Sequence, residues 1–153
     1  MKSKIIVVFT IFASFLYTNN VLAEDFASKS DAEAIVKRAV AHVKKYGVEK
    51  AGEDFTNRKG EFVDNDLYVT MYNMHAVVLA HGQNKKSIGK DMIDLKDSDG
   101  KEFVKERMEL AKKNKPFWQE YKFTDPVTKK VLPKEMYCET VSESVVCAGV
   151  YKR

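Results

Sequence analysis

Two phenols and an imidazole lie close together in the stretch Leu67–His81, which reads LYVTMYNMHAVVLAH. Tyr68 and Tyr72 fall on one face of a strand, because side chains two and four apart along a strand point the same way. His81 stands at the end of the returning segment. Such a set suits a polar pocket that hydrogen-bonds a small ligand. The same residue types are also common in sheets for packing reasons, so the hairpin alone leaves both interpretations open.

The residues around this set predict a β-hairpin. Apolar and polar side chains alternate with strand period from Leu67 to Tyr72. Asn73–Ala76 supplies a tight turn, and the apolar run Val77–Ala80 predicts the returning strand. We therefore expect the phenols and the imidazole to be positioned by two adjacent antiparallel strands.

The first 23 residues predict a secretory signal peptide. Lys2 and Lys4 precede the apolar run Ile5–Tyr17, and Val21–Ala23 fits a small-x-small cleavage site. The run has 13 residues, whereas a membrane-spanning helix needs about 20, so cleavage is favoured over a membrane anchor. The prediction is a signal peptide over 1–23 and a periplasmic or secreted single domain over 24–153.

The length and charge of the chain limit its partners. Removing 23 of the 153 residues leaves 130, which suits one hydrophobic core. The formal net charge is +4, and the leader holds two of the lysines and no acid, so the remaining chain carries +2. A charge this small does not predict binding to nucleic acid or to a membrane surface.

Two cysteines in an exported chain predict a disulfide. Cys138 and Cys147 lie in strand-like segments on either side of Ser142–Glu143. If that pair forms a two-residue hairpin loop, the cysteines face each other on a non-hydrogen-bonded rung with Cα atoms about 4.5 Å apart, within disulfide range. Two free buried thiols are the alternative.

Helices and strands account for the rest of the chain. A capping box at Ser30 and Glu33 opens an amphipathic helix that ends near Gly47. On a later helix, Arg107 shares a face with Phe103. The expected elements are helices over 30–47, 48–57 and 101–113, the hairpin over 67–81, and strands over 117–123, 134–141 and 144–151. Antiparallel strands with helices set apart indicate an α+β fold.

Several segments together resemble the Cache family, in its small single-domain form. They are KGEFVDNDLYVTMYN, VVLAH, IGKDMIDLKDSDGKEFVKE, FWQEY, DPVTKKVLPKEMY and AGVY, and the match runs from the helix at Ser30 to Tyr151. The resemblance implies a long N-terminal helix packed on a PAS-like antiparallel sheet of about five strands, with one further helix. It also implies an extracytoplasmic sensor of small molecules, often short carboxylates, of the kind found in chemoreceptors and sensor kinases.

The resemblance further implies a pocket on one face of the sheet. The residues at pocket positions are Tyr68, Tyr72, His81, Trp118, Tyr121, Lys134 and Tyr137. Lys134 would supply a cation, the tyrosines directed hydrogen bonds, and Trp118 an apolar wall. Lys134 and Tyr137 are three apart on a strand, so they face opposite sides unless a bulge re-aims one. Aromatic core packing with a surface lysine is the alternative.

The chain departs from the family pattern at three places. Asn73–Ala76 replaces the usual Asp-x-x-Gly turn, and Gly82 replaces a proline. Glu135 and Met136 replace small residues between the lysine and the tyrosine, and Glu135 would either weaken anion binding or point away. These departures leave the ligand undetermined.

The leading hypothesis is a soluble extracytoplasmic module that binds a short organic anion without a cofactor and presents it to a membrane receptor or sensor kinase. The alternative is a structural or interaction protein that keeps the fold without a ligand. No catalytic triad spacing, H-E-x-x-H or P-loop is present, so an enzyme is not expected. The three histidines lack zinc-type spacing, so no metal site is expected either.

Overall fold

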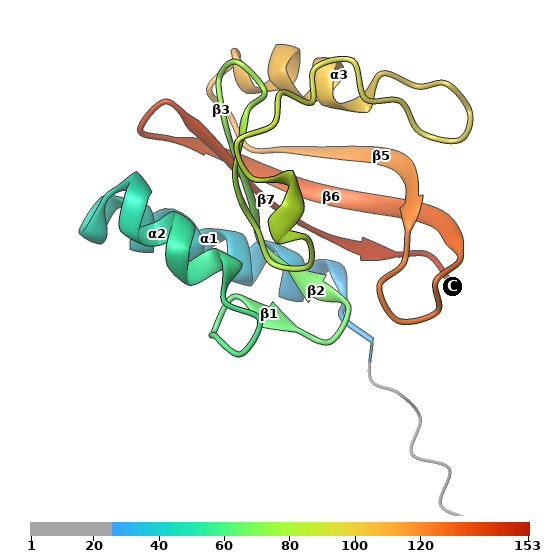
Figure 1. Cartoon of the computed structure of the whole chain (residues 1–153), viewed down its shortest axis with the longest axis horizontal. Coiled ribbons are helices and arrows are strands. Elements are labelled where there is room, and N and C mark those ends of the chain that lie inside the picture. The colour runs from blue at the N-terminus through green and yellow to red at the C-terminus, as the bar shows by residue number, and fades with distance from the viewer. Residues whose placement is uncertain (1–25) are drawn as a thin grey trace, which may run out of the picture.

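A five-stranded antiparallel β-sheet forms the centre of the computed structural model, which describes residues 26–153 (Figure 1). The strand order is β4-β3-β7-β6-β5. These strands are β3 (Thr70–Asn73), β4 (Val78–His81), β5 (Phe117–Thr124), β6 (Val131–Val141) and β7 (Ser144–Tyr151). A separate ribbon pairs β1 (Val63–Asp64) with β2 (Leu67–Tyr68). The predicted signal peptide, residues 1–23, lies outside the described residues.

Helices cover both faces of the sheet. The long helix α1 (Lys29–Tyr46) and the shorter α2 (Val48–Thr56) lie on one side, and α3 (Phe103–Ala111) lies on the other (Figure 1). The 3-10 helix η1 (Lys85–Ser87) belongs to the loop that leads from β4 toward α3. This arrangement confirms the predicted α+β fold, with a long N-terminal helix on a PAS-like sheet and a further helix on the opposite face.

The two ends of α1 are fixed by local hydrogen bonds and backbone geometry. Ser28 is the N-cap, and its hydroxyl accepts from the Asp31 backbone N–H while the Asp31 carboxylate accepts from that of Ser28. The capping box is therefore two residues earlier than the one predicted at Ser30. Gly47 ends the helix with a φ of +83°, a conformation that glycine adopts without strain.

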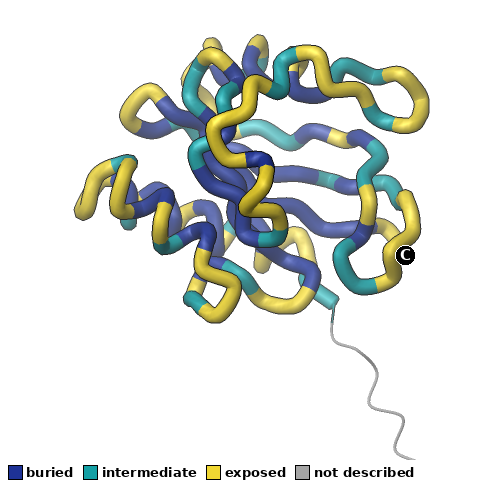
Figure 2. The backbone as a smooth tube through the Cα atoms, in the orientation of Figure 1, coloured by how far each residue is buried: buried dark blue, intermediate teal, exposed yellow. Residues whose placement is uncertain are grey.

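The sheet separates two apolar clusters. One lies under α1 and contains Val36, Ala39 and Val146, and the other lies under α3 and contains Phe103 and Val145. Every residue of β7 is buried, because the strand is covered on both faces. Figure 2 shows the strands buried in the middle of the molecule and exposed segments around them.

The turn between β3 and β4 forms without glycine. The Asn73 side-chain oxygen accepts from the backbone N–H groups of His75 and Val77, both at 3.0 Å. Ala76 takes the left-handed conformation that glycine would otherwise provide, with a φ of +63°. The predicted hairpin is confirmed over β3 and β4, whereas Leu67 and Tyr68, predicted as its first residues, pair with β1 instead.

The predicted pairing of Cys138 with Cys147 is also confirmed. The two residues are directly opposed on β6 and β7, with Cα atoms 4.2 Å apart, and they form a disulfide. Val141 pairs with Ser144, so Ser142 and Glu143 form a two-residue loop, and both have positive φ. A loop with two left-handed residues matches the twist of the flanking strands, which is why the register continues to the cysteines.

Removing this disulfide is expected to destabilise the fold by roughly 2.5 kcal/mol, because the short closed loop no longer restricts the unfolded chain. The double variant Cys138→Ala/Cys147→Ala tests this in urea unfolding against the oxidised wild type. An unchanged free energy of unfolding would contradict a stabilising role for the disulfide.

Candidate ligand-binding site

A small cavity of about 240 Å³ lies between the sheet and the segment that carries η1 and α3. The lining residues are Tyr68, Thr70, Tyr72, Val78, His81, Asn84, Ser87, Met92, Leu95, Phe103, Tyr121, Phe123 and Met136. Typical ligand pockets begin at about 300 Å³, so this one suits a molecule of only a few heavy atoms.

The guanidinium of Arg107 lies behind one wall of the cavity. The side chain is fully buried, and its central carbon lies 5.2 Å from the Tyr72 ring centre and 5.3 Å from that of Tyr121. Nε donates to Gln119 at 3.1 Å, whereas Nη1 and Nη2 have no hydrogen-bond partner among residues 26–153. Burial alone would lower the pKa of Arg107, but the phenol groups of Tyr121 and Tyr72 outweigh it and raise the pKa. A charged group with two unpartnered donors therefore lies behind the Tyr72 and Tyr121 rings, which line the cavity, whereas Arg107 itself does not.

Lys134 lies behind another wall. It is fully buried, and Nζ donates to the Tyr68 hydroxyl at 2.9 Å and to the Tyr151 hydroxyl at 3.3 Å. Burial and the charge of Arg107 lower the pKa of Lys134 to about 7, against an opposing effect of Asp66 and Asp125. Within the described part of the chain no carboxylate forms an ion pair with Nζ. An anion in the cavity would raise this pKa and favour the ammonium form.

His81 contributes a neutral imidazole. Its ring stacks on Tyr68 with centroids 5.1 Å apart, and Nδ1 accepts from the backbone N–H groups of Gln83 and Asn84. Burial, with the charges of Lys134 and Arg107, lowers the pKa of His81 to about 4. The ring is therefore uncharged at neutral pH, and its proton lies on Nε2.

The structure brings together most of the residues expected at the site. Tyr68, Tyr72, His81 and Tyr121 line the cavity, whereas Lys134 does not line it but donates to the Tyr68 hydroxyl. Glu135 points to the opposite face of the sheet, where it forms an ion pair with Lys29 at 2.9 Å. The carboxylate next to Lys134 in sequence therefore does not neutralise it.

Trp118 and Tyr137 are not brought to the cavity. They pack against each other in the cluster under α1, with ring centroids 5.3 Å apart, and the Tyr137 hydroxyl donates to Glu139. The pairing of β6 with β7 runs without a bulge, so Lys134 and Tyr137 face opposite sides as their spacing requires. Two of the seven expected pocket residues therefore belong to the other core.

Sequence reasoning missed Arg107 and Tyr151 as members of the site. Tyr151 is buried at the end of β7, and its hydroxyl donates to the Thr124 carbonyl at 3.0 Å while contacting Lys134. The signal for Arg107 was its place on the same helix face as Phe103. A charged residue on a buried face requires a partner, and within residues 26–153 only Gln119 supplies one.

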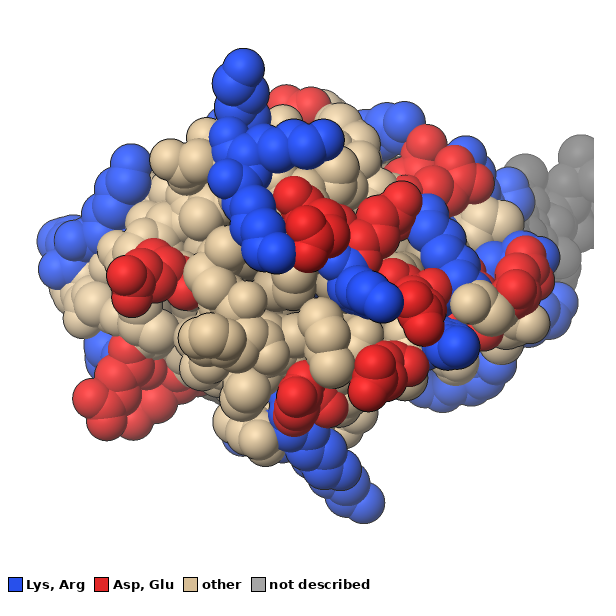
Figure 3. Space-filling model, turned by 90° about the horizontal axis from the view of Figure 1, so that it is seen from above, with Lys and Arg blue, Asp and Glu red and all other residues tan. Residues whose placement is uncertain are grey.

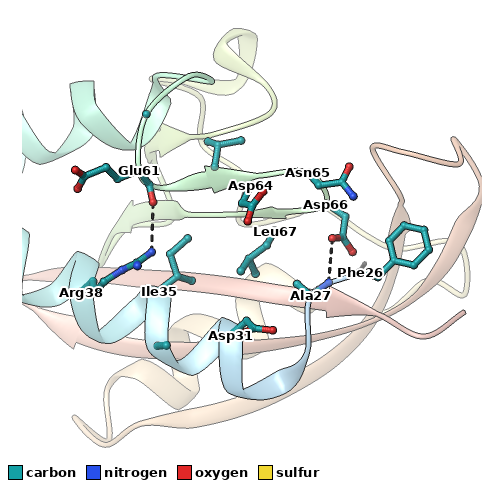
Figure 4. A pocket seen from close by; sticks show the side chains of 13 residues that line it. Phe26, Ala27, Asp31, Ile35, Arg38, Glu61, Asp64, Asn65, Asp66 and Leu67 are labelled. Atoms are coloured by element: carbon teal, nitrogen blue, oxygen red, sulfur yellow. Dashed lines mark hydrogen bonds between the residues drawn. The ribbon is translucent and has the colours of Figure 1, made fainter. Parts of the chain in front are cut away.

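A larger groove of about 850 Å³ runs between α1 and the β1–β2 ribbon (Figure 4). Arg38 donates to the Glu61 carbonyl and the Ala27 N–H to Asp66, as the dashed lines show. Asp66 is also bound by Arg153 at 2.8 Å. The buried acid of this groove is thus already paired, and its other acids face solvent, so the smaller cavity is the stronger candidate.

The sequence comparison identifies the family. A family model described as Single Cache domain 2 matches residues 20–151. The chain belongs to this family. No curated protein matches the chain. Within residues 26–153, no helix combines the length and apolar character needed to cross a membrane.

Solved structures share the Cache fold. A methyl-accepting chemotaxis protein from Vibrio parahaemolyticus RIMD 2210633 has a TM-score of 0.68 at 21% identity, over 80% of this chain and 87% of that one. A Cache chemosensory domain that recognises carboxylic acids has a TM-score of 0.68 at 22% identity, over 81% and 92%. The periplasmic sensor domain of a chemotaxis protein has a TM-score of 0.64 at 18% identity, over 81% and 90%. Similarity at these identities shows the fold alone.

Proposed function

We propose that this Cache domain is an extracytoplasmic binding module for a short organic anion, whose carboxylate pairs with Arg107. The observation that carries the proposal is the pair of unpartnered Nη atoms on a fully buried guanidinium beside a small cavity. Leaving such donors unpaired is costly, and a carboxylate fits the planar fork of arginine through two parallel hydrogen bonds. The two unpartnered donors therefore favour an anionic ligand.

The rest of the cavity defines the ligand further. Lys134 adds a second titratable cation, and the tyrosine hydroxyls and neutral His81 add polar contacts. Val78, Met92 and Phe103 supply apolar wall. A carboxylate with a short apolar or hydroxylated chain suits this combination.

The proposed compartment and partners rest on three supports. The leader over 1–23 fits a signal peptide, the disulfide is typical of oxidising compartments, and the fold is shared with periplasmic sensor domains of chemotaxis proteins. Lys and Arg are interspersed with Asp and Glu on the face in Figure 3, which gives no broad basic surface there for nucleic acid. We propose a membrane receptor or sensor kinase as the signalling partner.

A thermal-shift screen tests ligand binding directly. Short carboxylates are expected to raise the melting temperature of the protein, because they bind the native state alone, whereas their uncharged amides are not. Calorimetry then measures the dissociation constant of the best ligand. If no carboxylate shifts the melting temperature, the structural role without a ligand replaces this proposal.

Replacing Lys134 by methionine is expected to weaken binding of the anion about tenfold, the loss of one charge-assisted hydrogen bond. In the wild type, affinity should fall as pH rises through about 7, because the unbound protein loses the positive charge of Lys134. The groups facing Nζ are the phenols of Tyr68 and Tyr151, with Arg107, Asp66 and Asp125 acting from further away.

Calorimetry from pH 6 to 8.5 distinguishes this role from a structural one. The variant should show a flat pH profile over that range. Lys122→Met, which removes an exposed lysine paired with Asp99, is the matched control and should keep the wild-type profile. Equal affinities of wild type and Lys134→Met across the range would show that Lys134 does not contact the anion.

A further inference from the structure

We propose that Lys134 forms a reversible Schiff base with 2-oxo acids held in the small cavity, so that anions with a carbonyl next to the carboxylate are captured covalently. This inference rests on the proposed function, because the same cavity and the same arginine hold the carboxylate. It adds a chemical step that plain anion binding does not include.

The surroundings of Nζ are those of a nucleophilic amine rather than an ion-paired one. Its hydrogen-bond partners in the described structure are two phenol oxygens, and its nitrogen lies 4.1 Å from the Tyr68 ring centre and 4.6 Å from that of Tyr151. Burial and the nearby Arg107 lower the pKa of Lys134 to about 7. At pH 7 such an amine is roughly half neutral, whereas an ordinary lysine is neutral in roughly 1 molecule in 2,500. Desolvation beside another cation is a recognised way to activate lysine for imine formation.

Tyr68 can serve as the proton donor for this step. Its hydroxyl lies 2.9 Å from Nζ, and the same residue lines the cavity. Burial, with the neighbouring Tyr151, raises the pKa of Tyr68 well above its usual value, so the phenol carries its proton at neutral pH. Lys134 itself does not line the cavity, so the proposed reaction requires Nζ to rotate past this hydroxyl to reach the ligand.

In this proposal Arg107 orients the 2-oxo acid. Its free Nη atoms lie behind Tyr72 and Tyr121, and the cavity wall continues from these two residues to Tyr68. In the proposed complex the carboxylate pairs with the guanidinium, and the adjacent carbonyl carbon of the 2-oxo acid faces Tyr68 and Lys134. An anion without that carbonyl occupies the same place without reacting.

The chemistry is a condensation with no redox change. The Nζ lone pair attacks the carbonyl carbon, and a proton moves from nitrogen to the former carbonyl oxygen to give a carbinolamine. The Tyr68 hydroxyl then protonates that oxygen, the C–O bond breaks, and water leaves. Nitrogen forms the C=N bond and returns its remaining proton to the Tyr68 phenolate. One amine and one 2-oxo acid give one imine and one water, and hydrolysis reverses the step.

Borohydride trapping tests the proposal on the mature wild-type protein. Incubation with 2-oxobutanoate and sodium borohydride should reduce the imine to a stable secondary amine, which adds the mass of the acid less water plus two hydrogens. Peptide mapping is expected to place the adduct on Lys134, in about tenfold or greater excess over any exposed lysine. 2-Hydroxybutanoate, which has the same carboxylate and no carbonyl, should give no adduct and should suppress trapping when added in excess.

The possible outcomes distinguish covalent capture from the proposed anion binding on which it rests. If calorimetry shows that 2-oxobutanoate and 2-hydroxybutanoate bind but Lys134 is labelled no more than exposed lysines, covalent capture is wrong and anion binding stands. If neither binds, both are wrong. Lys134→Met should lose trapping completely, whereas its binding of 2-hydroxybutanoate should fall only by the roughly tenfold expected above. Labelling of Lys134 that persists unchanged in urea-unfolded wild type would also overturn the inference, and this control does not depend on a variant folding.

Discussion

Arg107→Met is expected to weaken carboxylate binding about a hundredfold or more while the ligand-free protein keeps its stability. Each of the two free Nη donors can form a charge-assisted hydrogen bond to the carboxylate, worth roughly 1.5–3 kcal/mol, and 1.4 kcal/mol corresponds to a factor of ten. Losing both bonds therefore removes most of the binding free energy of a small ligand. Calorimetry on wild type and variant measures the ratio of the dissociation constants.

The stability of the Arg107→Met protein is expected to be unchanged because burying the guanidinium charge is itself unfavourable. Nη1 and Nη2 have no partner within residues 26–153, so replacing Arg107 by an apolar side chain of similar size removes no hydrogen bond from them and relieves the cost of burying the charge. Gln119 loses the bond from Nε but still donates to the Phe103 carbonyl at 2.7 Å. We expect the free energy of unfolding in urea to change by about 1 kcal/mol or less.

Arg38→Met is the matched control for this experiment. Arg38 donates to a backbone carbonyl at the rim of the larger groove, away from the cavity, so its loss should leave carboxylate affinity unchanged. An Arg107→Met protein that binds the carboxylate as tightly as the wild type would remove Arg107 from the site and the main support for an anionic ligand.

The elements that could be predicted from the sequence are those governed by local period. The opposition of Cys138 and Cys147 followed from alternation in two strands and a loop of two residues, and both features are local. The end of α1 at Gly47 was likewise predicted from a local signal, the glycine itself. The helix over Phe103–Ala111 was placed within two residues at each end, because its apolar face repeats at helical spacing.

The residues of the site were harder to predict from the sequence, because they depend on which side chains of each strand face α3 and which face α1. Tyr137 and Trp118 were assigned by resemblance, yet strand alternation puts them under α1, opposite Lys134. Arg107 was visible as a charge on an apolar helix face, but its role depends on the segment carrying η1, Met92 and Leu95. That segment has no regular period, so the sequence does not predict the cavity that it closes.

A second buried charge cluster connects the two ends of the described chain close to the site. Arg153 forms ion pairs with Asp66 at 2.8 Å and with Asp125 at 3.0 Å, and both acids are almost completely buried. Its guanidinium also lies 3.5 Å from the ring centre of Phe26. Burial alone would raise the pKa of Asp125, but hydrogen bonds from Thr128 and the Val127 N–H, with the charge of Arg153, outweigh it and lower the pKa.

Arg153→Met is expected to destabilise the fold by about 3 kcal/mol at pH 7, because it leaves two buried carboxylates without their shared cation. The value lies at the low end for a broken buried pair, since the bonds from Thr128 to Asp125 remain. A carboxyl with a lowered folded-state pKa stabilises the fold above its unfolded pKa and loses that contribution as pH falls through the folded value. Urea unfolding at several pH values should therefore show the deficit shrinking as the pH falls below the ordinary Asp pKa of about 4, because the contribution of Asp125 is then lost.

Lys152→Met gives the matched control for this measurement. Lys152 is the preceding residue and pairs with Glu120 at 2.8 Å, but it is exposed, so its loss should cost less than about 1 kcal/mol at any pH. Each variant removes one positive charge. A difference between their free energies of unfolding therefore reports the burial of the acids that pair with Arg153, not the change in net charge. A deficit for Arg153→Met no larger than that for Lys152→Met, or one that stays constant from pH 7 to pH 3, would show that the buried acids do not depend on Arg153.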